Sequence, residues 1–178
     1  RSYSATIVGK PPMEDCFLAK ATERIFLPLL QQTLPEIRDI NFPLEGVFHD
    51  CVMVSIKKTY PQQAKKVMHA IWGMGQMMFT KMIIVVDEHV DVQKEKEVWW
   101  RVFNNIDAKH DIVMVEGPLD ALDHSSPMAK WGTKIGIDAT KTWPEEGHTR
   151  EWPDEINMSD DIKKLVDAKW QDRKSTRL

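Results

Sequence analysis

A continuous apolar run near the middle of the chain constrains the fold more than any other feature. Residues 81–86 read Lys-Met-Ile-Ile-Val-Val. A half-exposed strand alternates apolar and polar residues, whereas an unbroken β-branched run is typical of a strand that is buried on both faces. Such a strand needs packed layers above and below it. We therefore predict a central strand in a layered α/β domain.

Comparable segments lie on either side of this run. Residues 50–57 and 111–116 have strand-like patterns, and helical periodicity fills the intervals 61–78 and 94–105. The sequence Gly73-Met74-Gly75 falls inside the first of these helical patterns, where we expect a kink or a close helix contact. Strands that alternate with helices are typical of βαβ units, so we predict a mainly parallel sheet with flanking helices.

The N-terminal third of the chain has a different pattern. Residues 3–8 suit a strand, and a helix is predicted from residue 14 to about residue 32, with a kink or an early break at Pro28. Residues 36–48 contain Pro43 and Gly46 and are expected to be irregular. The predicted helix carries an apolar face with spacings of three and four: Phe17, Leu18, Ala21, Ile25 and Leu29.

Regular periodicity ends after Gly117. Prolines and glycines recur through a long stretch that we predict to be an irregular arm, followed by a terminal helix at about 160–173 with Ser159 as its N-cap. The apolar face of this helix is formed by Ile162, Leu165, Val166 and Trp170. Tryptophans are favoured at interfaces, and three lie in this region: Trp143, Trp152 and Trp170. We expect the arm and terminal helix to contact another subunit.

Composition narrows the class of protein. The chain has 178 residues, of which 42% are hydrophobic and 29% charged, which suits one domain, or one domain with an arm, and argues against disorder throughout. A net charge of -3 with interspersed signs gives no reason to expect nucleic acid or an anionic membrane as a partner. No apolar run approaches the roughly 20 residues that a membrane-spanning helix needs. Cys16 and Cys51 are predicted to be buried thiols in a reducing, cytoplasmic setting.

One polar cluster follows the strongest strand. Asp87, His89 and Asp91 lie where α/β folds commonly bind ligands, and they have donor atoms that suit a divalent cation. A strand-to-helix loop also needs such residues for solubility and helix capping, and we favour that interpretation. The six histidines share no metal-ligand spacing, and no Ser-His-Asp or Cys-His pattern can be assembled.

Several longer segments are less generic, and together they resemble the UbiD family of carboxy-lyases. These are TIVGKPPMED (6–15), ERIFLPLLQQTLPEI (23–37), FPLEGVFHDCVMVSIKK (42–58), FTKMIIVVDEHVDV (79–92) and GTKIGIDATKTWPEE (132–146). They cover nearly the whole chain in order. The resemblance is nearer to the polyprenyl-hydroxybenzoate carboxy-lyases than to the fungal cinnamic-acid decarboxylases.

The resemblance implies a division of the chain. Family members have an N-terminal α/β domain, a split β-barrel that holds prenylated FMN, and a C-terminal α/β domain. Residues 1–12 would be the end of the severed barrel, 13–34 a linking helix, 35–117 the C-terminal domain, and 118–178 the arm and terminal helix. Because the sequence begins at Arg1 without an initiating methionine, we expect it to be part of a longer polypeptide.

The implied activity is non-oxidative decarboxylation of an aromatic or α,β-unsaturated acid, with a quinone-pathway 4-hydroxybenzoate-type acid as the first guess. Prenylated FMN supplies the electron sink, with manganese and potassium near its phosphate. The family's catalytic and metal-binding motifs do not occur here, so no catalytic or metal-binding residue is assigned. We expect the isolated chain to be inactive and to bind no cofactor. Its implied partners are the flavin-binding part of the same polypeptide, identical subunits and the acid.

The resemblance also suggests residues for the cleft. Arg38 falls near a basic position that some members use beside the cofactor phosphate. Asn41, Phe42, Leu44 and Met78 would face the substrate, although Phe42 and Leu44 also suit a protein core. Two other functions remain open: an assembly or binding module without catalysis, and a small metal-dependent enzyme built on the Asp87 cluster.

Overall fold

The computed structural model describes residues 14–48, 50–121, 123 and 125–175. The strand expected over residues 3–8, and the barrel segment expected over 1–12, lie outside these residues. The chain divides into two units, Arg1–His148 and Thr149–Leu178. The first unit contains the sheet and its helices.

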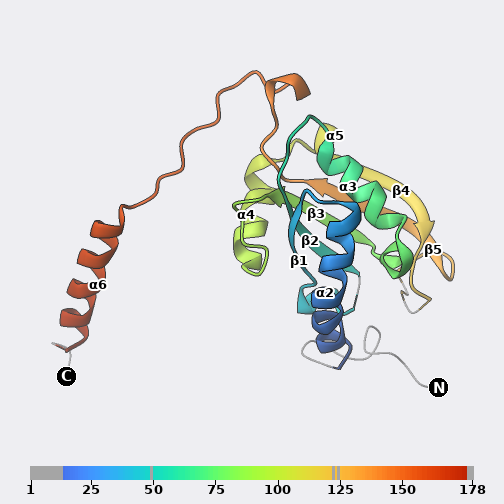
Figure 1. Ribbon diagram of the computed structural model, residues 1–178, viewed down its shortest axis with the longest axis horizontal. Helices are drawn as coiled ribbons and strands as arrows, with labels where there is room; N and C mark the ends of the chain where they lie inside the picture. Colours follow the sequence, from blue (N-terminus) through green and yellow to red (C-terminus); the bar gives the residue numbers. More distant parts are fainter. Residues whose placement is uncertain (1–13, 49, 122, 124, 176–178) are drawn as a thin grey trace. The chain divides into compact units, whose positions relative to one another are not determined.

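A five-stranded sheet organises the first unit, with the strand order β1-β2-β3-β5-β4 (Figure 1). Its strands are β1 (Ile37–Asn41), β2 (Cys51–Ile56), β3 (Met82–Asp87), β4 (Ile112–Pro118) and β5 (Trp131–Asp138). Strands β2, β3 and β5 are parallel, and β1 and β4 are antiparallel edges. The predicted α/β fold is confirmed, and so is the central, doubly buried place of β3.

Helices cover the two faces of the sheet. Helices α2 (Glu14–Thr33) and α3 (Gln63–Trp72) pack on one face and α4 (Glu95–Asn105) on the other. Alternation along β2 serves both layers, because Val52 and Val54 join the first core while Met53 joins the second. The remaining elements of this unit are short: α5 (Ala108–Asp111), η1 (Leu44–Gly46), η2 (Gly75–Phe79) and η3 (Pro144–Glu146).

Strand β5 corrects the sequence analysis, which placed these residues in an irregular stretch beginning at 118. The segment was missed because Gly132, Lys134 and Gly136 interrupt its apolar pattern. The two glycines allow close packing: a Cβ on Gly136 would lie 2.5 Å from Met68 Sδ, and one on Gly132 would lie 2.9 Å from Leu119 Cδ1.

Two further expectations were wrong. The helix predicted to reach Met78 stops at Trp72, because Gly73 caps it and Gly75 then takes a left-handed φ of 46°. These glycines therefore end the helix and do not kink it. Residues 36–48 were expected to be irregular, but β1 forms there. A register shift between Ile37 and Asp39 breaks the alternation that would have identified this strand.

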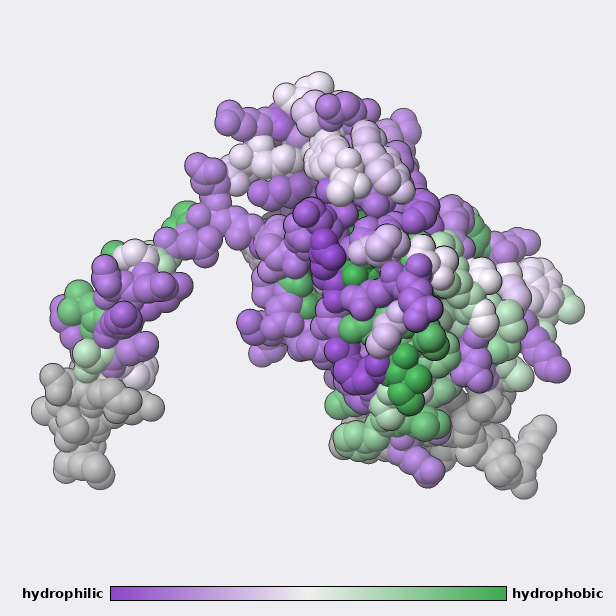
Figure 2. Space-filling view, in the orientation of Figure 1, coloured by the Kyte–Doolittle hydropathy of each residue, from purple (hydrophilic) through white to green (hydrophobic). Residues whose placement is uncertain are grey.

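Helix α2 continues through Pro28, so the early break expected there does not occur. Its predicted apolar face does not meet the sheet. The exposed fractions of Phe17, Leu18, Ile25 and Leu29 lie between 52% and 65%, and Figure 2 shows hydrophobic residues gathered over this helix. The buried side is formed by Cys16, Ala19, Glu23 and Leu30.

The second unit contains helix α6 (Asp160–Ser175). Its predicted N-cap is confirmed, because Ser159 Oγ accepts a hydrogen bond from the backbone N–H of Ile162 at 3.4 Å. The four apolar side chains of its stripe (Ile162, Leu165, Val166 and Trp170) remain 46–59% exposed. Among the described helices, none combines the length and apolarity needed to cross a bilayer.

Candidate ligand-binding recess

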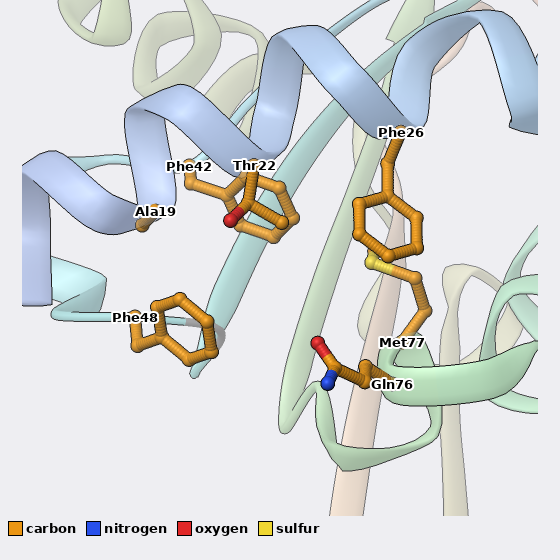
Figure 3. A pocket seen from close by; sticks show the side chains of 7 residues that line it. All are labelled: Ala19, Thr22, Phe26, Phe42, Phe48, Gln76 and Met77. Atoms are coloured by element: carbon orange, nitrogen blue, oxygen red, sulfur yellow. The ribbon is translucent and has the colours of Figure 1, made fainter.

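An apolar recess lies between α2 and η2 in the first unit (Figure 3). About 260 Å³ of space that protein atoms do not occupy lies here, open solvent included. Its described lining is mostly aromatic and aliphatic: Ala19, Thr22, Phe26, Phe42, Phe48, Gln76 and Met77. None of these side chains is charged. The Thr22 hydroxyl and the Gln76 amide are the polar groups that they offer to a ligand.

Helical spacing builds one wall of the recess. Ala19, Thr22 and Phe26 follow one another at intervals of three and four along α2, so they share one side of the helix. The small Ala19 side chain leaves the space that the recess occupies, and the Phe26 ring lies next to Met77 of η2 (Figure 3). The exposed apolar residues Leu18, Ile25 and Leu29 belong to the neighbouring side of the same helix.

A buried carboxylate fixes the position of Phe42. Glu23 is almost fully buried, and its Oε2 accepts a hydrogen bond from the Phe42 backbone N–H at 2.7 Å. Lys20 Nζ lies 3.2 Å from the same oxygen. Gln93 Nε2 donates to Glu23 Oε1 at 3.3 Å, which connects this network to the loop after β3. A buried charge with several donors is stable only when these groups stay in place, so Phe42 is held rigidly against the recess.

The four predicted pocket residues have different surroundings. Phe42 lines the recess, and Met78 lies in η2 next to the lining residue Met77. Asn41 is buried elsewhere: its Nδ2 donates to the Val92 carbonyl at 2.6 Å, and its Oδ1 accepts from Lys20. The carbonyl of Leu44 lies 3.1 Å from the Cys16 thiol. Contact of all four with a substrate stays a prediction.

Arg38, the predicted phosphate contact, lies on edge strand β1. Its guanidinium is partly exposed, and Nε lies 3.2 Å from Glu88 Oε2. A surface ion pair of this kind is weak and exchangeable, so the guanidinium is free to change partners. Its proposed contact with the cofactor phosphate is untested.

Most of the recess escaped the sequence analysis. Sequence patterns did not identify the α2 residues or Phe48, because the strongest apolar stripe of α2 lies on another side of the helix. Gln76 and Met77 were predicted to continue the preceding helix, but that helix ends at Trp72 and they lie in η2. The i, i+3, i+7 spacing of Ala19, Thr22 and Phe26 was the one available signal.

At the carboxyl ends of the parallel strands, a common place for ligands, the chain forms a buried ion pair. Lys58 Nζ lies 2.6 Å from Glu146 Oε2, and the two side chains are 3% and 2% exposed. Glu146 also accepts backbone hydrogen bonds from Gln62 at 2.6 Å and Trp143 at 2.7 Å. The pair therefore fastens the segment after β5 to the end of β2. Trp143 packs over the same ammonium, with 5.2 Å from Nζ to the ring centroid.

The possible metal site finds no support. Asp87 Oδ2 accepts the backbone N–H of Lys141 at 2.9 Å, and burial raises the pKa of its carboxyl. Asp91 is exposed and accepts the backbone N–H of Gln93 at 3.0 Å. Asp87, His89 and Asp91 do not form a metal-binding group, and no other described set of three such residues does. The cluster behaves as an ordinary strand-to-helix loop.

The two cysteines carry no chemistry in this arrangement. Cys16 is buried as predicted and Cys51 is half-buried, and both are free thiols. Burial raises the pKa of the Cys51 thiol to about 12, so the nucleophilic thiolate is disfavoured.

Two proteins of known sequence are similar to this chain. A protein of Archaeoglobus fulgidus with no characterized function is 54% identical over 96% of this chain and 36% of its own length. An Aquifex aeolicus protein, likewise uncharacterized, is 49% identical over 94% of this chain and 35% of its own length. This chain thus spans about a third of the length of these relatives.

Solved structures show the same fold. Vanillic acid decarboxylase of Sedimentibacter hydroxybenzoicus in its open form matches with a TM-score of 0.78 and 27% identity, over 94% of this chain and 36% of that one. The UbiD-class enzyme HmfF from Pelotomaculum thermopropionicum, solved in complex with FMN, matches with a TM-score of 0.72 and 26% identity, over 85% and 34%.

A family description covers most of the chain. The sequence model for the 3-octaprenyl-4-hydroxybenzoate carboxy-lyase C-terminal domain matches residues 16–139, from α2 to the residue after β5. The predicted resemblance is confirmed, and the chain belongs to the UbiD family as its C-terminal domain.

Proposed function

We propose that this domain forms the acid-binding side of a decarboxylase whose flavin is held by another part of the same polypeptide. The observation that carries the proposal is the uncharged recess between α2 and η2. A carboxylate is unfavourable in such surroundings, whereas an aromatic ring or an apolar tail gains from leaving water. The recess would receive the hydrocarbon end of an aromatic or unsaturated acid, and the carboxyl group would point out of the mouth.

The recess does not suit the flavin. Its described lining offers no cation for a phosphate. Prenylated FMN, which would supply the electron sink, therefore belongs to the flavin-binding part in this proposal. Arg38 would approach its phosphate from the edge of the sheet.

The exposed side of α2 supports a covering partner. Phe17, Leu18, Ile25 and Leu29 form an apolar stripe next to the recess wall, and stripes of this kind usually mark contact surfaces. A flavin-binding part placed on this stripe would also lie over the mouth of the recess and exclude water from it. Relatives about three times as long as this chain have enough additional sequence for such a part.

Finer features of the proposal follow the family resemblance. The acid would be a quinone-pathway 4-hydroxybenzoate-type compound, and manganese and potassium would accompany the flavin phosphate. The stripe of α6 would pack on an identical subunit. The two free thiols suit a cytoplasmic protein.

Filling the recess tests the proposal. In the longer, flavin-loaded polypeptide, Ala19→Leu should raise KM for the acid about tenfold while kcat changes little, because uniform binding is lost. Ala168→Leu, the same substitution on the exposed surface of α6, is the control. An unchanged KM in a folded Ala19→Leu variant would remove the acid from this recess. A polypeptide that never decarboxylates aromatic acids would favour the assembly-module alternative.

A further inference from the structure

Lys134 is a buried cation that no function assigned so far explains. It lies on β5, and only 2% of the residue is exposed. No described carboxylate forms an ion pair with it, in contrast to Lys58, whose ammonium meets Glu146. Burial without a counter-ion lowers the pKa of Lys134 to about 8. An uncompensated ammonium is costly inside a protein, and an apolar side chain of similar volume would fill the space at a lower cost.

The ammonium is directed at one backbone atom. Lys134 Nζ donates a hydrogen bond to the carbonyl oxygen of Met78, and it lies 6.0 Å from the centroid of the Trp72 ring. The lysine stem crosses Gly117 of β4, where an added Cβ would lie 3.3 Å from Lys134 Cε. Glycine on the neighbouring strand therefore leaves room for the stem, and the aromatic face offsets part of the desolvation of the ammonium.

The segment that receives this hydrogen bond has little stability of its own. Element η2 is a five-residue 3₁₀ helix that follows the glycine-containing end of α3, and such short helices have weak internal bonding. The end of the segment is held a second time, because Trp72 Nε1 donates to the carbonyl of Thr80 at 3.0 Å. Met78 and Thr80 are thus both tied to side chains from outside η2.

We propose that Lys134 is a positioning residue for the ligand recess: its ammonium holds the Met78 carbonyl and so fixes η2, which carries the recess-lining residues Gln76 and Met77. A charged donor makes a stronger hydrogen bond than a neutral one, and this suits the task of holding a short 3₁₀ segment. This tether, the hydrogen bond from Lys134 to the Met78 carbonyl, does not depend on the proposed function. Its consequence for an acid substrate rests on the proposed function.

Hydrogen exchange in the full chain tests the tether without reference to activity. Lys134→Met keeps the length of the stem and removes the donor. The amides of residues 75–80 should then exchange about tenfold faster or more, as expected when a hydrogen bond from a charged group is lost. Lys134→Arg retains a charged donor and should restore most of the protection. Val98→Ala, in the core on the opposite face of the sheet, is the control for a general loss of stability.

The outcomes separate positioning from simple packing. Faster exchange confined to 75–80 in Lys134→Met, and absent from Val98→Ala, supports the tether. Equal changes throughout the sheet, or no change at 75–80, would overturn it. If Lys134→Met does not fold, Gly117→Ala displaces the stem more gently and should increase exchange in the same six residues, and unaltered exchange there counts against the proposal.

A second readout concerns ligand binding. In the flavin-loaded longer polypeptide, Lys134→Met should raise KM for the acid several-fold more than it lowers kcat. A parallel fall in kcat with constant KM would contradict a role in shaping the recess. If the polypeptide proves to have no decarboxylase activity, the exchange result still decides whether Lys134 holds η2, so the two proposals can fail separately.

Discussion

Helices α2 and α3 pack on the same face of the sheet but bury different kinds of surface. Along α3, the apolar residues Val67, Met68 and Ile71 are completely buried. Along α2, large apolar residues such as Phe17 and Ile25 are exposed, and the buried side combines Leu30 with the smaller or polar residues Cys16, Ala19 and Glu23. Helix α3 is thus stabilised within this chain, whereas α2 has a second apolar surface that the described residues leave uncovered.

This difference separates the part of the domain that is packed within the chain from the part that a partner could cover. The sheet, α3, α4 and the segment after β5 form a core within the first unit. Around α2, a stripe and a recess lie side by side, and both gain from being covered. In the proposed function, the flavin-binding part would cover this side of α2.

The largest expected effect concerns the buried ion pair of the self-contained region. Lys58→Met should lower the free energy of unfolding by about 3–5 kcal/mol, because it leaves the Glu146 carboxylate buried without its partner. Lys66→Met breaks a pair with Glu36 in which the lysine side chain is 46% exposed, and it should cost less, about 1 kcal/mol. Urea unfolding of both variants measures the difference, and equal costs would show that the segment after β5 is not fastened as described.

A direct test compares one isoleucine from each helix. Ile71→Ala in α3 should cost about 2–5 kcal/mol, whereas Ile25→Ala in α2 should stay within about 0.5 kcal/mol in the 178-residue chain. In the longer polypeptide the cost of Ile25→Ala should rise to about 2 kcal/mol, because the side chain is then buried. A cost for Ile25→Ala that is the same in both lengths would mean that nothing covers α2.

A pH effect marks a weak point at the start of β2. Burial raises the pKa of Asp50 from 3.8 to about 6, although Lys81 opposes the shift. The folded state therefore favours the neutral acid. This contribution is present below about pH 4 and is lost as the pH rises through 6. Asp50→Asn should be about 1 kcal/mol more stable than the wild type at pH 7, after allowance for partial exposure, and equal to it at pH 4. Thermal unfolding of both proteins at pH 4 and pH 7 measures this difference. A variant that is no more stable than the wild type at pH 7 would contradict the prediction.

The smallest effect on stability is expected in the second unit. Val166→Asp lies on the exposed stripe of α6 and should leave the melting temperature of the first unit unchanged. If α6 contacts an identical subunit, the same change should reduce the subunit number measured by analytical ultracentrifugation. A fall in melting temperature without a change in mass would instead place the stripe against its own chain.

Sequence patterns identified the elements that are apolar on one side only and those that are apolar on both sides. The run Ile83 to Val86 identified the central strand, and the buried side of α3 followed from its spacing. They failed where close packing required glycine, as at Gly136 against Met68, or where a bulge broke the alternation, as at Ile37. Periodicity also found the apolar stripe of α2, but it cannot distinguish the side that meets this sheet from the side that meets another domain.

Of the residues predicted to face the substrate, Phe42 lines the recess and Met78 follows the lining residue Met77, and their contact with a substrate stays a prediction. The other residues of the recess depend on tertiary details. Glu23 orients Phe42 from a position that periodicity would assign to a solvent-exposed charge. Lys134 would have been placed on the surface by any rule based on polarity, yet it holds the Met78 carbonyl from inside the core.

In the proposed function, this domain shapes the acid site and another part of the polypeptide holds the flavin. The most direct measurement is a titration of the purified 178-residue chain with prenylated FMN in the presence of manganese and potassium, followed by flavin fluorescence. We expect no saturable binding to this chain and tight binding to the longer polypeptide. Tight, saturable binding to the 178-residue chain alone would contradict this expectation, because the flavin site would then lie within these residues.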